Sequence, residues 1–220
     1  DWEGVIAAKR NLAKNAVGVV DKVHYLKEIG DDYHDKLNNL EKAMAAYLEA
    51  IEYQPENMGI LYQAFSLYVK MEQWKKALEM LHRLAALETD SLRRGKFYYT
   101  GAVILRDQLK STDEAIEQFN QALDQYFADP TRITADKFQE YLKPFESIDK
   151  ICTARKDWKN QERNYRKMLK RMPRTGYEQI TVALWHALGE VYRSRLKDVP
   201  AAIQAFEVAA KLEPTLQKRH

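Results

Sequence analysis

Apolar residues recur along this chain every three or four positions, which is the spacing of helices that bury one face. The pattern is clearest near the C-terminus, where Leu188, Gly189 and Tyr192 share one side of a first predicted helix. Ala202 and Phe206 share one side of a second helix. Gly189 and Ala202 let a neighbouring helix backbone come close because their side chains are absent or small, and Phe206 fills the remaining space. The pattern therefore predicts an antiparallel helix pair.

The same pattern returns along the chain with a fixed period. Trp74 follows Trp2 by 72 positions, and Ala102 follows Gly30 by the same interval. A third, slightly longer copy begins near Trp158. Self-similarity at a fixed period marks units that bury their faces against each other, so we expect one stack of helix pairs over residues 1–220. The predicted pairs cover residues 22–56, 57–90, 91–129, 131–173 and 177–215, and an unpaired helix at 2–15 precedes them.

Two of these helix pairs depart from the pattern. Phe65 stands where a small residue is expected, so we expect the pair at 57–90 to be splayed or shifted. In the pair at 131–173, Asp149 and Gln161 replace small residues. That pair is therefore the weakest match to the repeat.

Prolines and polar residues set the expected helix ends. Pro144 is predicted to open a helix, after a connection over residues 129–143 that contains an extra helical turn. Pro214 is predicted to end the last helix, because its ring and missing N–H cannot continue the hydrogen-bond ladder. Asn, Asp and Ser in turns such as 37–39 and 110–113 are expected to act as helix caps or helix-starting residues.

Two short motifs carry a resemblance to a known family. Residues 185–192 give the spacing W-x2-L-G-x2-Y, and residues 202–206 give A-x3-F. The chain resembles the tetratricopeptide repeat over nearly its whole length. The resemblance implies an all-α fold, a right-handed α-solenoid of antiparallel helix pairs whose first helices line a concave groove for a peptide or a partner helix. The same phrases are similar to long repeat arrays of gliding and soil bacteria, which implies a signalling or motility protein as partner.

Composition narrows the classes of function. Lys and Arg number 35 against 32 Asp and Glu, so the net charge of +3 is smaller than a nucleic-acid binder usually shows. The single cysteine excludes an internal disulfide framework and suits a cytoplasmic setting. No apolar run is long enough to predict a membrane span. Because the first residues read as the middle of a repeat, we expect a segment of a longer array, whose targeting signals would lie outside it.

Residues that carry catalytic or metal chemistry do not form a recognisable site in the sequence. Phosphate-binding glycine loops are absent, so no cofactor is predicted. Cys152 falls at a core position and is expected to be a buried, inert thiol. Trp74 and Trp158 recur at equivalent turns, which favours packing within a helix pair over binding of a partner. The histidines show no metal-ligand spacing; they are His24, His34, His82, His186 and His220.

One side of each first helix remains after the core positions are assigned, and we call it the first-helix strip. It combines cationic and aromatic side chains, which are frequent in protein interfaces. The alternative is an ordinary solvated helix face with an accidental charge balance. In chaperone-binding members of the resembled family this face grips a terminal carboxylate, but Asp31 stands where an asparagine is wanted. The strip residues expected to bind a partner are Lys27, His34, Tyr62, Lys96, Tyr99, Arg106, Lys143, Lys150, His186 and Arg193.

The sequence therefore predicts a non-catalytic scaffold or adaptor that binds an acidic peptide or protein surface in its groove. Two alternatives stay open at this point. The first is a helical-repeat RNA-binding module, which the slight basic surplus allows, and the second is a regulatory module of a larger enzyme or signalling protein. A small-molecule ligand, a metal and a membrane are not expected partners.

Overall fold

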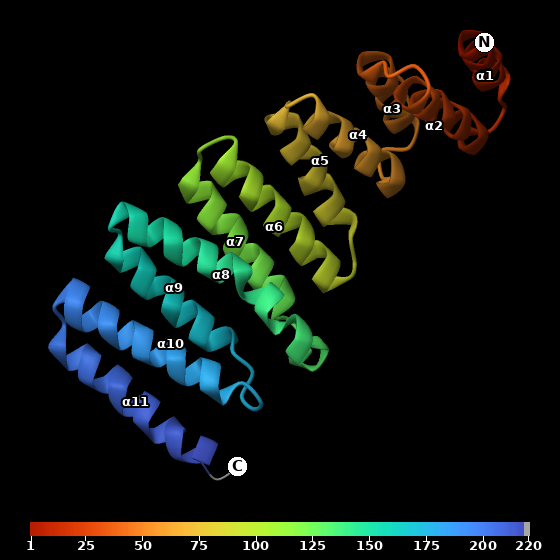
Figure 1. Cartoon of the computed structure of the whole chain (residues 1–220). Helices are drawn as coiled ribbons and strands as arrows, with labels where there is room; N and C mark the ends of the chain where they lie inside the picture. The colour runs from red at the N-terminus through yellow and green to blue at the C-terminus, as the bar shows by residue number, and fades with distance from the viewer. Residues whose placement is uncertain (218–220) are drawn as a thin grey trace. The chain divides into compact units, whose positions relative to one another are not determined.

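The structure, a computed structural model, describes residues 1–217 (Figure 1). Within that range the chain forms eleven α-helices and no β-strand, so the all-α prediction is confirmed. His220 lies outside the described residues. The helices are α1 (Trp2–Asn15), α2 (Val19–Asp35), α3 (Leu40–Tyr53), α4 (Met58–Lys70), α5 (Trp74–Leu87), α6 (Ser91–Asp107), α7 (Thr112–Tyr126), α8 (Ala135–Arg155), α9 (Trp158–Arg171), α10 (Glu178–Glu190) and α11 (Val199–Gln217).

The chain divides into two compact units, Asp1–Lys110 and Ser111–His220. The first contains α1 to α6 and the second contains α7 to α11. Successive helices are joined by short turns, as a solenoid of antiparallel helix pairs requires (Figure 1). The division falls inside the predicted pair at 91–129. An uninterrupted stack over residues 1–220 therefore stays a prediction, and the two units are described separately.

Glycines permit the tight packing inside two helix pairs, one in each unit. A Cβ atom on Gly30 would overlap the ring of Tyr47, which comes from the second helix of the same pair. A Cβ atom on Gly189 would lie 2.6 Å from Cε1 of Phe206. The sequence predicted small residues at both positions but assigned the space to a neighbouring backbone. An aromatic ring occupies it instead.

The turn inside each helix pair contains one residue in the left-handed backbone region. The φ angles lie between 48° and 57°, a region that residues other than Gly, Asn and Asp seldom adopt. Four of the five residues are Glu or Lys, so the fold, rather than local preference, imposes this conformation. The residues are Asn38, Glu72, Lys110, Lys156 and Lys197.

Polar side chains cap several helix N-termini, as predicted. Asn39 accepts from the Lys42 amide at 3.0 Å, and Asp157 accepts from the Asn160 amide at 3.2 Å. Such caps satisfy backbone donors that have no partner inside the helix. Ser111, which the sequence placed in a capping turn, makes no cap and donates to the Glu114 carboxylate at 2.7 Å.

The predicted helix start at Pro144 is wrong. Helix α8 runs without a break from Ala135 to Arg155, with Pro144 buried inside it. The extra helical turn expected before it is present as the 3-10 helix η1, Pro130–Arg132. Phe138 and Phe145, on either side of the proline, are both buried. Burial of this apolar face offsets the single hydrogen bond that proline removes from the helix.

The predicted helix end at Pro214 is also wrong, since α11 continues to Gln217. A proline within a helix removes the bond from its own N–H and crowds the carbonyl four residues earlier, but it does not prevent a helix that has begun upstream from continuing. The helix before it changes shape at its C-terminal end, where α10 continues into a π-helical segment, η2 (Val191–Leu196). Whether Phe65 splays the pair at 57–90 stays a prediction.

Candidate functional site

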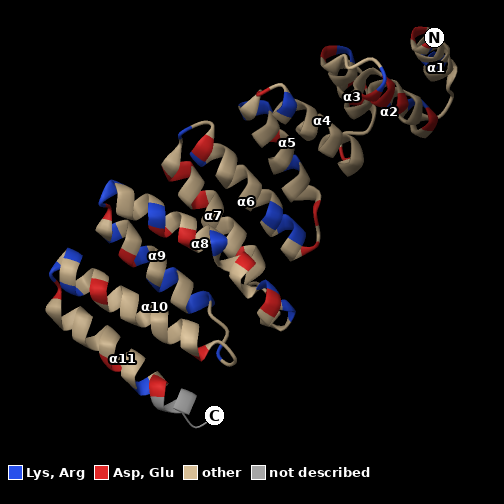
Figure 2. Ribbon diagram, in the orientation of Figure 1, with Lys and Arg blue, Asp and Glu red and all other residues tan. Residues whose placement is uncertain are grey.

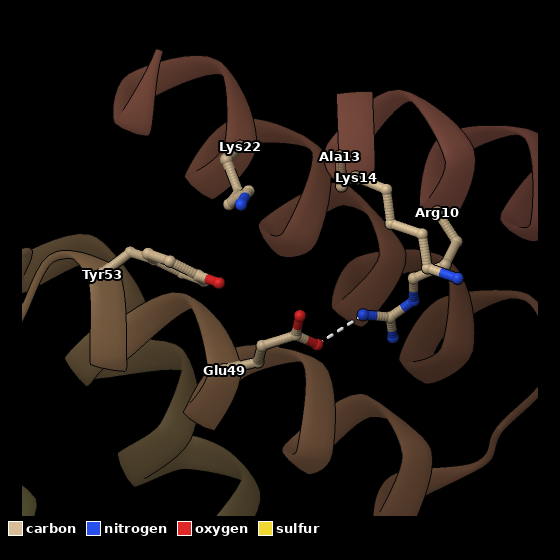
Figure 3. A pocket seen from close by; sticks show the side chains of 6 residues that line it. All are labelled: Arg10, Ala13, Lys14, Lys22, Glu49 and Tyr53. Atoms are coloured by element: carbon tan, nitrogen blue, oxygen red, sulfur yellow. Dashed lines mark hydrogen bonds and ion pairs between the residues drawn. The ribbon is translucent and has the colours of Figure 1, made fainter. Parts of the chain in front are cut away.

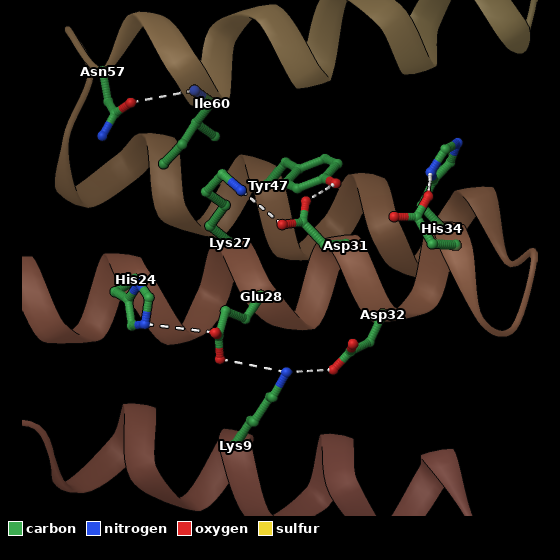
Figure 4. A network of polar contacts seen from close by, with 11 residues as sticks. Lys9, His24, Lys27, Glu28, Asp31, Asp32, His34, Tyr47, Asn57 and Ile60 are labelled. Carbon is green, nitrogen blue, oxygen red and sulfur yellow. Dashed lines mark hydrogen bonds and ion pairs between the residues drawn. The ribbon is translucent and has the colours of Figure 1, made fainter.

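The part of the first-helix strip on α2 is held in a polar network (Figure 4). Lys27 Nζ donates to Asp31 Oδ2 at 2.6 Å, and the Tyr47 hydroxyl donates to Asp31 Oδ1 at 2.7 Å. Burial, with the Asp31 carboxylate, raises the pKa of Tyr47 far above its usual value. Lys27 is therefore a partner of Asp31 within this pair of helices. Lys27 already has a carboxylate partner, so this arrangement does not resemble a binding site for a terminal carboxylate.

His34, the second strip residue on α2, is also engaged by neighbours. Its Nδ1 pairs with the Asp35 carboxylate. Its Nε2 lies 2.5 Å from Nζ of Lys70, which comes from α4. His34 therefore links two helix pairs.

The opposite side of α2 binds α1 through charged side chains (Figure 4). Lys9 Nζ lies 2.6 Å from Asp32 Oδ2 and 3.3 Å from Glu28 Oε2. His24, although exposed, lies 3.6 Å from the same Glu28 carboxylate. Ile6 of α1 is buried and supplies the apolar contact. The ion pairs fix how α1 is oriented against α2.

The strip is more open on α4 and α6. Tyr62 is 53% exposed, and its ring centroid lies 5.9 Å from that of Phe65. Lys96 is exposed and makes no ion pair among the described residues. Tyr99 is half-buried. Arg106 forms a bidentate pair with Asp107, both contacts at 2.7 Å, which lowers the pKa of the Asp107 carboxyl.

In the second unit the strip has two free lysines and two paired residues. Lys143 and Lys150 on α8 are exposed and form no ion pair within the part of the chain that the structure describes. His186 on α10 lies 3.3 Å from Glu213. Arg193, in η2, pairs with Glu190 at 2.8 Å.

The ten predicted strip residues are thus divided between the two units. Lys27, His34, Tyr62, Lys96, Tyr99 and Arg106 lie in Asp1–Lys110, and Lys143, Lys150, His186 and Arg193 lie in Ser111–His220. Figure 2 shows that Lys and Arg are interspersed with Asp and Glu along both units. Three exposed lysines and one exposed tyrosine are the strip residues most available to a partner; they are Tyr62, Lys96, Lys143 and Lys150.

The polar residues that weakened the match of the fourth helix pair bond to each other within it, although Gln161 Oε1 is buried without a hydrogen-bond partner. Gln161 Nε2 donates to Asp149 Oδ1 at 2.8 Å and to the Thr153 hydroxyl at 3.0 Å. Burial, together with the charge of Asp149, raises the pKa of Tyr165. A polar contact between half-buried Asp149 and buried Gln161 therefore replaces the small-residue contact of the other pairs, and it offsets part of the cost of burying the Gln161 amide.

Asparagines and an arginine join α7 to α9 by a second buried network. Asn120 donates to Asn164 at 2.8 Å, and Arg171 Nη1 donates to Asn120 Oδ1 at 3.0 Å. Arg171 also pairs with Asp124 at 2.7 Å. No sequence signal marks this network, because its hydrogen bonds join residues 44 and 51 positions apart and each residue alone reads as a surface residue.

The first unit also contains a basic pocket that the sequence does not indicate (Figure 3). It is about 570 Å³ in volume and lies between α1, α2 and α3. Arginine, lysine and tyrosine side chains reach it from three different helices, so no local motif marks it. Its lining residues are Arg10, Ala13, Lys14, Lys22, Glu49 and Tyr53.

The other residues considered for chemistry have structural surroundings. Cys152 is buried as predicted, and burial raises the pKa of its thiol to about 11. Trp74 and Trp158 are partly buried, and the Arg195 guanidinium lies 4.7 Å from the centre of the Trp158 ring. Within the described range no group of three or more His, Cys, Asp or Glu residues is placed to hold a metal ion, and no helix is both long and apolar enough to cross a bilayer.

A family model matches residues 2–147, which includes α1 to α7 and more than half of α8. The model describes the second ARM domain of tetratricopeptide repeat protein 21. The chain belongs to this family. Membership in this tetratricopeptide repeat family agrees with the helix pairs described above and confirms the resemblance carried by the sequence motifs. A search of curated proteins finds no significant match.

Solved structures with a similar fold are also repeat proteins. A tetratricopeptide repeat protein from Parabacteroides merdae is 18% identical, with a TM-score of 0.49, over 96% of this chain and 71% of that one. MamA is 16% identical, with a TM-score of 0.46, over 89% of this chain and 94% of that one. YrrB, whose structure is described as having an unusual peptide-binding site, is 15% identical, with a TM-score of 0.44, over 93% and 91%.

Proposed function

We propose that this chain is a non-catalytic scaffold or adaptor, which holds a peptide or a protein surface against the first-helix strip. The observation that carries the proposal is that three lysines of the strip are exposed and, within the described chain, unpaired; they are Lys96, Lys143 and Lys150. Each is exposed on a first helix and forms no ion pair among residues 1–217. The other cations of the strip already have carboxylate partners, so these three are the charges left for an external one.

The partner we propose is acidic and contains apolar or aromatic side chains. Lysines on α6 and α8 attract carboxylates, and electrostatic complementarity of this kind contributes association rate and specificity. Exposed Tyr62 offers a flat ring with a polar tip, as interface anchors do. A signalling or motility protein in the cytoplasm is compatible with this chemistry.

The proposal is tested by selecting peptides that bind the chain from a displayed random library and measuring their affinities by isothermal titration calorimetry. Lys96→Glu tests the first unit and Lys150→Glu tests the second. Each reversal is expected to weaken the selected acidic peptides by about threefold to tenfold, because a repelling charge replaces an attracting one. Circular dichroism should show unchanged helicity.

Matched controls reverse exposed lysines outside the strip, Lys75→Glu on α5 and Lys167→Glu on α9. These controls should leave affinity within about twofold, since distant exposed charges are screened by salt. Affinity that survives both strip variants, or falls equally in the controls, would show that the strip is not the binding surface. Salt-dependent binding of generic RNA that exceeds peptide binding would favour the RNA-binding alternative instead.

A further inference from the structure

The basic pocket is built by three helices of the first unit. Arg10 and Lys14 come from α1, Lys22 comes from α2, and Tyr53 ends α3. In Figure 3 the Tyr53 hydroxyl points into the space between Lys22 and Glu49. Ala13 lines the pocket with a small, buried side chain. The volume of about 570 Å³ is large enough for an anionic group and part of the chain that carries it.

Positive charge exceeds negative charge around this pocket. Arg10 pairs with Glu49, which is the one carboxylate in the lining. Lys22 Nζ lies 4.7 Å above the centre of the Tyr53 ring, a contact that holds the ammonium group in place without neutralising it. Lys14 is exposed and makes no ion pair within residues 1–217. Two cations are therefore left without a counter-charge.

A pocket at a corresponding position of the second unit has a different lining from the basic pocket. Arg10 follows Trp2 by eight positions, as Arg166 follows Trp158. Arg166 lines a pocket of about 300 Å³ between α9, α10 and α11, whose other lining residues are Trp185, Leu188, Tyr192, Ala201, Gln204, Ala205 and Val208. That lining has one cation and is largely apolar. The basic lining is therefore a property of the first unit.

Apolar side chains close in sequence to the lining of the basic pocket are unusually exposed. Val17, Val19 and Val20 lie in the short segment between Lys14 and Lys22, with exposed fractions of 104%, 50% and 70%. Neighbouring exposed apolar residues are a common feature of binding surfaces. A ligand with an anionic group and an apolar neighbour would contact both features at once.

We propose that the basic pocket binds a carboxylate or phosphate group of a peptide, with Lys14 and Lys22 as its counter-charges and the exposed valines against the adjoining apolar residues. The anion competes with Glu49 for Arg10, so Arg10 binds the anion when its ion pair with Glu49 breaks. The site is separate from the first-helix strip, because Lys27 and His34 lie in the polar networks on another side of α2. The proposal does not depend on strip binding.

The test follows backbone amide chemical shifts of the full chain during titration at constant ionic strength. Succinate is the carboxylate probe, inorganic phosphate is the phosphate probe, and chloride is the reference. We expect saturable shifts in residues 10–22 and 49–53. Saturation with succinate alone assigns a carboxylate ligand, saturation with phosphate alone assigns a phosphorylated ligand, and saturation with both assigns an anion site for either. No saturable shift, or shifts confined to the strip, would overturn the proposal.

Variants of opposite sign make the test specific. Lys14→Gln and Lys22→Gln should each weaken the responding probe by about threefold to tenfold, because each removes one attracting charge. Glu49→Gln should strengthen it by a similar factor, since it removes the competing carboxylate. Lys75→Gln, an equal charge change outside the pocket, should leave it unchanged. An unaltered or reduced affinity in Glu49→Gln, with helicity retained, contradicts the proposal.

Discussion

Gly30 and Gly189 each leave room for an aromatic ring from the second helix of their own pair. The rings belong to Tyr47 and Phe206, and they are placed where a Cβ atom on the glycine would lie. Sequence spacing identified both glycines as close-packed positions because they recur on the buried side of a first helix. It did not identify the occupant, since a small residue permits either a backbone or a ring to approach.

Replacing Gly189 by Leu is expected to destabilise the fold by about 1–3 kcal/mol, because the new side chain overlaps Phe206. Urea unfolding followed by circular dichroism measures the change. Gly18→Ala is the control, since its Cβ would meet only the Asp21 carboxylate at 3.4 Å. Equal stability of Gly189→Leu and the wild type would show that the ring is not fixed against the glycine.

Cys152 is expected to make stability depend on pH in the alkaline range. Its thiol pKa rises from 9.0 to about 11 in the folded chain because burial disfavours the thiolate. Below pH about 9 the thiol is protonated in both states and contributes no pH dependence. Between about 9 and 11 the unfolded state loses the proton while the folded state keeps it, so stability falls as pH rises.

Thermal unfolding across this range should therefore show a shallower decline in Cys152→Ala than in the wild type. Absolute stability of the variant is expected to be lower, because it leaves a small cavity, so only the slopes are compared. Equal slopes would show that the thiol ionises with the same pKa in both states. Buried Tyr47 and half-buried Tyr165, whose pKa values are also raised, contribute a decline that both proteins share.

At the scale of elements, periodic apolar residues predicted the helices well, whereas prolines predicted helix ends at the wrong positions. Pro144 and Pro214 are strong breakers in isolation, and both lie inside helices of the structure. The buried face of α8 continues on both sides of Pro144, and its burial outweighs the one missing bond. Local breaker rules therefore fail where an apolar face of a long helix spans the breaker.

The left-handed turn residues make a prediction at this scale. Lys156→Gly and Glu72→Gly should each stabilise the chain by about 0.5–1 kcal/mol, because glycine adopts the φ of 55° found at both positions without steric cost. The midpoint of urea unfolding measures this gain. Lys167→Gly, in the interior of α9, is the control and should cost about 1 kcal/mol, since glycine weakens a helix interior. A loss of stability in both turn variants would mean that the Glu and Lys side chains supply contacts that outweigh backbone strain.

At the scale of the whole molecule, the sequence predicted which helix face the strip occupies but not which of its charges are available. The pairing of Lys27 with Asp31 follows the i,i+4 spacing of one helix, which a sequence can indicate. The contact of His34 with Lys70 becomes evident only when the neighbouring α4 is in place. The basic pocket was invisible for the same reason, because its cations come from separate helices.

The division into two units predicts that a destabilising substitution in one unit leaves the other unit folded. Gly30→Leu should raise amide hydrogen exchange in α2, α3 and their neighbours in the first unit, while α9 to α11 keep most of their protection. Repeat proteins behave in this way because each element contacts only its neighbours. Hydrogen exchange measured by mass spectrometry resolves the two regions. Equal loss of protection in both units would indicate one cooperative unit.

The pairing of a glycine with an aromatic ring also limits how these repeats change during evolution. The corresponding positions of the pair at 57–90 hold Phe65 and Leu81, with the larger residue on the first helix. Passing from one arrangement to the other requires two substitutions. If the first helix changes before the second, the intermediate is overcrowded, and if the order is reversed, it contains a void. Either intermediate would be less stable than both the starting and the final arrangement. The two sites should therefore change together across related sequences.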